Sequence, residues 1–208
     1  MRRGPVRMTI ATLLRGLVAG GCLVLLPATA HAHLVNTGLG PFYDGVSHFA
    51  LTPEDLLPAL ALALLAGQRG SRAGRLALFG LATAWLLGGL VGLVFPTIES
   101  ATTLTTVSFL ALGGLVAAEA RLNPEWVTGL ALVVGLLHGY LNGAAMAQAK
   151  LGALGLVGIV STLFVTVALA AAMVVAIRVP WGRIAVRVAG SWIAAVGLLL
   201  LGWSLRAA

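Results

Sequence analysis

The chain has 208 residues, of which 60% are hydrophobic and only 9% are charged, and its formal net charge is +7. A soluble domain needs many more charged residues to cover its surface. This composition therefore excludes an ordinary soluble globular protein and predicts an all-α integral membrane protein.

The first 32 residues are predicted to be a cleavable secretory signal. Four arginines precede a short apolar stretch at 16–26, and the small-residue pattern Ala30-His31-Ala32 follows it. The alternative is an uncleaved first transmembrane helix, for which the stretch is short. Cleavage would remove the single cysteine, Cys22, and leave 33–208 as one transmembrane domain with nine basic and six acidic residues. Because its net charge would be only +3, nucleic-acid binding is not expected.

Six further apolar stretches predict six transmembrane helices. They lie at 52–67, 75–95, 100–118, 125–148, 152–177 and 181–203. Seven arginines fall in or beside one set of alternate connections, and the other set keeps only Lys150 and Arg206. By the positive-inside rule, this predicts a multi-pass protein of the bacterial inner membrane with a periplasmic mature N-terminus. Six helices also allow a three-plus-three inverted repeat, a known transporter plan.

Half of the acidic residues precede or begin the first predicted span. Thr52 is a suitable N-cap, Pro53 suits the first helical position, and Glu54 and Asp55 would occupy the first turn, where carboxylates interact favourably with the helix dipole. This local explanation accounts for two acids without a function.

Asp44 and His48 need a different explanation. Four residues apart, they would share a face of a helix, and a carboxylate and an imidazole are suitable ligands for a first-row metal ion, although such a pair is more often an ordinary hydrogen bond. Cleavage after residue 32 would also give His33 a free α-amine beside its imidazole, a second candidate metal ligand. The alternative for His33 is a frayed N-terminus.

The fourth predicted span carries polar residues in apolar surroundings. Gly135, Gly139 and Gly143 recur every four residues and predict a stripe against which another helix packs closely. His138 and Asn142 lie beside this stripe. An ionisable residue at this depth is a functional candidate, and the alternative is a neutral histidine that hydrogen-bonds to a neighbouring helix.

The third predicted span begins with a polar stretch, from Glu99 to Ser108. Glu99, Thr102, Thr103 and Thr106 lie roughly on one face of the expected helix. They would line a polar entrance path, or would satisfy the backbone and neighbouring helices.

These motifs together resemble the HupE/UreJ family of bacterial membrane proteins, which are associated with nickel supply to hydrogenase and urease. The family's first motif is a histidine, five residues, and then Asp-His. In this chain His48 is followed after five residues by Glu54 and Asp55, so the acid is retained as glutamate and an aspartate replaces the second histidine.

The family's later motif, His-Gly-x-x-His-Gly-x-Glu, matches at His138, Gly139 and Gly143. Asn142 and Ala145 stand where the family has histidine and glutamate. The resemblance thus implies a metal site poorer in nitrogen than usual. Carboxylate-rich sites favour magnesium or manganese, whereas imidazole favours nickel or cobalt.

The resemblance implies a permease that moves a divalent transition-metal cation from periplasm to cytoplasm, with nickel(II) as the expected ion and cobalt as an alternative. The expected ligands are Asp44, His48, Glu54, Asp55, His138, Asn142 and, after cleavage, His33. No permanently bound cofactor is expected. Neither a P-loop nor a Gly-x-Ser-Gly nucleophile motif occurs in the sequence, which argues against an enzyme. The rival interpretation is a non-transporting accessory protein of a metalloenzyme system, and a homo-oligomer or an accessory partner is compatible with either.

Overall fold

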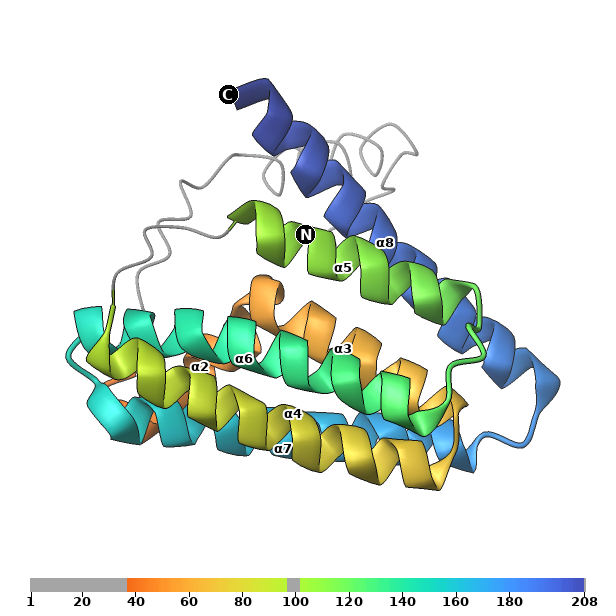
Figure 1. Cartoon of the computed structure of the whole chain (residues 1–208), viewed down its shortest axis with the longest axis horizontal. Helices are drawn as coiled ribbons and strands as arrows, with labels where there is room; N and C mark the ends of the chain where they lie inside the picture. The colour runs from red at the N-terminus through yellow and green to blue at the C-terminus, as the bar shows by residue number, and fades with distance from the viewer. Residues whose placement is uncertain (1–36, 97–101, 208) are drawn as a thin grey trace, which may run out of the picture. The chain divides into compact units, whose positions relative to one another are not determined.

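The computed structural model describes residues 37–96 and 102–207, and all regular structure in these ranges is α-helical (Figure 1). The helices in chain order are α2 (Pro41–Leu51), α3 (Pro53–Gln68), α4 (Ser71–Val94), α5 (Thr102–Ala117), α6 (Pro124–Gln148), α7 (Gly152–Ala176) and α8 (Pro180–Ala207). The predicted all-helical architecture is confirmed for these residues. The predicted signal sequence, His33 and Glu99 lie outside them.

Four of the described helices, α4, α6, α7 and α8, are long and apolar enough to cross a membrane. Helices α2 and α3 meet this criterion only as a pair, which is bent by 70° and would make a fifth span. Helix α5 has 16 residues, or about 24 Å, which is less than the ~30 Å hydrocarbon core of a bilayer. The multi-pass character is therefore supported, and the full set of six spans stays a prediction.

The break between α2 and α3 occurs at Thr52. Its backbone is extended, with φ −98° and ψ 98°, because the ring of Pro53 disfavours a helical conformation in the preceding residue. Thr52 and Pro53 occupy the predicted N-cap and first helical positions, although the Thr52 side chain makes no capping hydrogen bond. Helix α2 itself was not predicted. The break places His48 four residues before the bend and Asp55 three residues after it.

Helix α3 is the central element of the described bundle. It contacts α4, α5, α6 and α7, and residues 61–67 are buried without interruption. A helix that is apolar on all sides is expected to be enclosed by other helices in this way. Around it, α4 pairs with α6, α2 packs on α7, and α5 packs on α8 (Figure 1). Side chains from α3 can therefore meet side chains from several spans.

The predicted glycine stripe of α6 faces the backbone of α4. Gly135, Gly139 and Gly143 abut Leu81, Trp85 and Gly89, respectively. A Cβ atom on Gly139 would overlap the Trp85 backbone, so the two helices approach as closely as they do only because these positions lack side chains. This contact fixes the rotation of α6 and thereby the direction in which His138, beside the stripe, points.

Candidate functional site

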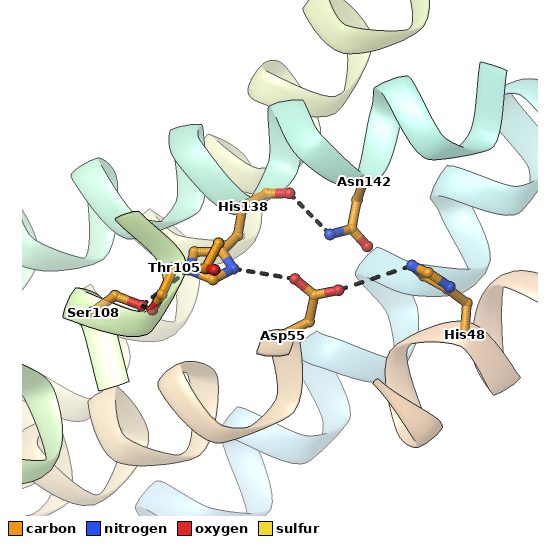
Figure 2. A network of polar contacts seen from close by, with 6 residues as sticks. All are labelled: His48, Asp55, Thr105, Ser108, His138 and Asn142. Carbon is orange, nitrogen blue, oxygen red and sulfur yellow. Dashed lines mark hydrogen bonds and ion pairs between the residues drawn. The ribbon is translucent and has the colours of Figure 1, made fainter. Parts of the chain in front are cut away.

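A carboxylate lies between two histidines at the centre of the bundle (Figure 2). Asp55, in the first turn of α3, is 5% exposed. Its Oδ2 atom lies 3.9 Å from Nε2 of His48 on α2, and its Oδ1 atom lies 3.1 Å from Nδ1 of His138 on α6. Three helices thus contribute one side chain each to a buried polar cluster.

The His138 ring is completely buried near the middle of α6, and both of its nitrogens have partners. Nδ1 faces Asp55, and Nε2 lies 3.2 Å from the hydroxyl of Ser108 on α5. The same hydroxyl is 2.6 Å from the Thr105 carbonyl. Because a hydroxyl has one hydrogen, Ser108 either donates it to Nε2 or donates it to Thr105 and accepts from a protonated Nε2. The surroundings therefore satisfy both the neutral and the protonated imidazole.

Aromatic packing holds this ring in place. The indole of Trp85 stacks on His138 with ring centroids 5.5 Å apart and an interplanar angle of 28°. Phe49, next to His48 on α2, packs edge-on against the Trp85 ring, with ring centroids 5.9 Å apart. Trp85 is fully buried. The close approach of α4 and α6 at Gly139 brings this indole against the imidazole, so the glycine stripe and the polar cluster are parts of one arrangement.

Asn142, one turn beyond His138 on α6, contributes a free acceptor. Its Nδ2 atom donates to the His138 carbonyl at 2.9 Å, whereas its Oδ1 atom is buried and has no hydrogen-bond partner among the described residues. In Figure 2 this oxygen points toward the side on which Asp55 and His48 lie. A buried acceptor without a partner costs free energy, which makes it a candidate ligand atom.

Two of the predicted ligands, Asp44 and Glu54, lie elsewhere in the structure. Asp44 is buried, but its Oδ1 accepts hydrogen bonds from the backbone N–H and the hydroxyl of Thr37, both at 2.7 Å, and so it ties the preceding segment to α2. Glu54 is exposed, whereas its neighbour Asp55 is buried, because adjacent helical residues point about 100° apart. Neither side chain joins the cluster around His138.

The polar residues predicted for the third span are divided. Thr106 is buried and Thr103 is exposed, so they do not form a single polar face. The Thr102 side chain and Glu99 lie outside the described residues. Residues that do reach the site from α5 are Thr105 and Ser108 (Figure 2). Ser108 closes the predicted polar stretch but was not singled out, and Trp85 gave no sequence signal beyond an aromatic residue in an apolar run.

The spacing of His48 and Asp55 is compatible with one shared ion. A separation of 3.9 Å between Nε2 and Oδ2 is too long for a hydrogen bond. Two ligands that each lie ~2.1 Å from one metal ion are separated by about 3.0 to 4.2 Å, depending on the angle between them. Among the described residues, however, no three His, Cys, Asp or Glu side chains form a group that could hold a metal ion. Further donors would have to include the amide oxygen of Asn142 and water.

Of three comparisons with known proteins, one finds a match. No curated protein and no solved structure matches the chain. The model of the HupE / UreJ protein family matches residues 21–200. This match covers most of the 208 residues, including the bent helix pair and the cluster around His138. The chain therefore belongs to the HupE/UreJ family.

Proposed function

We propose that the protein is an inner-membrane permease that moves a divalent transition-metal cation, with nickel(II) as its preferred ion, from the periplasm to the cytoplasm. The family is linked to nickel and metal handling for hydrogenase and urease. The apolar helices of this chain suit a lipid bilayer. Buried polar residues within such helices are costly, and in transporters they mark the path of the substrate.

The observation that carries the proposal is the pairing of His48 with Asp55 across the α2–α3 break. The two atoms that face each other, Nε2 and Oδ2, are 3.9 Å apart and leave room for an ion between them. Transporters commonly build substrate sites where a membrane helix is interrupted. Here the interruption at Thr52 provides both ligands, one from each side of the bend.

The ligand set also bears on the choice of ion. His48 would supply a nitrogen donor, whereas Asp55 and Asn142 would supply oxygen donors. Imidazole favours nickel over magnesium, and a single imidazole among oxygens permits rapid release, which transport requires. His138 is assigned a positioning role, because both of its ring nitrogens are engaged by Asp55 and Ser108. In metal sites, hydrogen bonds of this kind orient a ligating carboxylate.

A non-transporting accessory protein is the second candidate. The closed hydrogen-bond network of Asp55, His138 and Ser108 favours it, since such a network can fix the orientation of three helices without binding a substrate. In that case the protein would act on a metalloenzyme system through a partner.

No catalytic role is proposed, although Ser108, His138 and Asp55 are hydrogen-bonded in the order of a hydrolytic triad. A triad serine must be open to a substrate carbonyl while its histidine accepts and returns a proton. Here the imidazole is completely buried and stacked against Trp85. The arrangement is better suited to positioning Asp55 than to attacking a substrate.

Uptake of radiolabelled nickel by a bacterial strain that lacks other nickel permeases would test the proposal. Cells expressing the chain should accumulate nickel above the vector control, and unlabelled cobalt should compete better than magnesium. The purified protein in liposomes, with a nickel-sensitive dye inside, should give the same order of ions. Membrane-inserted protein without uptake in either system would favour the accessory role.

A further inference from the structure

One end of the described bundle is strongly basic. Seven arginines lie where α3, α5 and α7 end and α4, α6 and α8 begin, and we call this the arginine end: Arg69, Arg72, Arg75, Arg121, Arg178, Arg183 and Arg187. The acidic residues described there are Glu119 and Glu125. Glu119 pairs with Arg183 at 2.8 Å, and Glu125 pairs with Arg72 at 3.6 Å. Five arginines therefore remain without a carboxylate partner among the described residues.

Two adjoining cavities open among these arginines. Their volumes are about 390 and 430 Å³, and both are lined by Gln68, Arg69, Glu119 and Arg183. Arg178 lines the first cavity, and Arg121 and Arg187 line the second. The positive-inside rule requires basic residues near the membrane surface, but it does not require them to surround a cavity.

Arg69, which lines both cavities, favours an anionic ligand. Its Nε atom is buried and has no hydrogen-bond partner among the described residues. A guanidinium N–H is a strong donor, and burying it without an acceptor is unfavourable. Arg69 lines both cavities, so an anionic oxygen held there would lie beside its guanidinium group. Phosphate oxygens match the planar guanidinium particularly well.

An apolar groove adjoins the first cavity. It has a volume of about 330 Å³ and runs between α4 and α7, with Leu78, Ala168, Ala171 and Ala172 in its wall. Arg75 and Arg178 also line this groove. Arg178 also lines the first cavity, so the groove and the basic cavity meet at this residue. A free anion would need only the cavity, whereas an amphipathic anion would use both.

We propose that the arginine end binds an anionic phospholipid, with the phosphate headgroup against Arg69 and Arg178 and an acyl chain along the α4–α7 groove. Basic pockets between membrane helices bind anionic headgroups by the same combination of charge and hydrogen bonding. The bound lipid would join α3, α4 and α7 at the end of the bundle opposite Lys150. Lipid binding at the arginine end would not require nickel transport.

Native mass spectrometry of the full chain in a neutral detergent tests the headgroup. Phosphatidylglycerol should bind at least about tenfold more tightly than phosphatidylcholine. Arg69→Gln and Arg178→Gln should each weaken phosphatidylglycerol binding about fivefold. Arg72→Gln is the matched control, because Arg72 is exposed, pairs with Glu125 and lines neither cavity. Equal binding by Arg178→Gln and Arg72→Gln would overturn the proposal, and since Arg178 is exposed this variant is expected to fold.

The groove and the source of the phosphate are tested separately. Ala172→Trp should fill the groove and reduce lipid binding, whereas Met173→Trp should not, because Met173 is exposed outside the groove. Millimolar inorganic phosphate should leave phosphatidylglycerol binding unchanged. Displacement of the lipid by inorganic phosphate, together with normal binding by Ala172→Trp, would show a site for a free anion and would overturn the assignment to a lipid.

Discussion

Asp55 contacts two histidines from opposite ends of its carboxylate, with Oδ1 3.1 Å from His138 and Oδ2 3.9 Å from His48. The shorter contact is a hydrogen bond, and the longer one is not. The two histidines that the sequence suggested as equivalent ligands are therefore not equivalent in the structure. His48 is the candidate ligand, and His138 holds the carboxylate in place.

The adjacent acids Glu54 and Asp55 should differ sharply in function. Asp55→Asn removes the negative charge at the centre of the cluster and should lower nickel uptake by about tenfold or more. Glu54→Gln should leave uptake near normal, because Glu54 is exposed. Uptake must be normalised to the amount of protein in the membrane. If Glu54→Gln lowered uptake more than Asp55→Asn, Glu54 would be the functional acid, as the family's first motif implies by aligning Glu54 with its aspartate.

Replacing each histidine should separate binding from folding. His48→Ala should abolish uptake without loss of membrane protein, because His48 lies at the edge of the cluster with its side chain 16% exposed. His138→Ala leaves a buried carboxylate without its hydrogen-bond partner, which costs about 3–5 kcal/mol. It should reduce both the amount and the thermal stability of the protein.

The two histidine variants are compared by immunoblot of membranes and by thermal unfolding in detergent. Glu125→Ala is a control for expression, since that side chain is exposed and pairs only with Arg72 among described groups. Identical stability losses for His48→Ala and His138→Ala would contradict the division of roles.

Asn142→His should shift the ion preference. It would replace an amide oxygen beside Asp55 with an imidazole nitrogen, which favours nickel or cobalt over manganese or magnesium. Turnover should be equal or slower, because a tightly held ion leaves slowly. Competition between ions for binding to the purified protein measures the preference, because this readout does not require transport. The shift should disappear in a His48→Ala background, and a shift that persists there would mean that the two residues do not share an ion.

The α4–α6 interface should tolerate no added side chain at Gly139. A Cβ atom there would overlap the Trp85 backbone, and overpacking of this kind typically costs about 1–3 kcal/mol. Gly129→Ala on the same helix is the matched control, because a Cβ at Gly129 meets nothing within 4 Å. Thermal unfolding of the two purified variants gives the comparison. Equal melting temperatures would show that the helices separate without cost.

Reporter fusions test the orientation. A reporter fused after Arg206 should be periplasmic, and one inserted in the Gln68 to Gly74 region should be cytoplasmic, because the arginines cluster at that end of the helices. Paired alkaline phosphatase and fluorescent-protein fusions provide the readout. The reverse pattern would place His48 on the cytoplasmic side and contradict the proposed entry of the ion from the periplasm.

The sequence by itself determined the features that depend on composition and on near neighbours. Apolar length and the scarcity of charge predicted a helical membrane protein. The Thr52-Pro53 pair placed the start of α3 at the observed residue, because proline restricts the conformation of the residue before it. The four-residue spacing of Gly135, Gly139 and Gly143 predicted a close helix contact without identifying the helix that makes it.

Only the tertiary structure decided which polar residues meet. Asp55 and His138 are 83 residues apart in sequence, and Ser108 and His138 are 30 apart. Such contacts depend on the rotation of one helix against another, which the packing of Gly139 on Trp85 sets and no local pattern encodes. For the same reason, sequence spacing grouped Asp44 with His48 and left Glu54 and Asp55 equivalent. The folded chain instead directs Asp44 to Thr37 and selects Asp55 for the buried cluster.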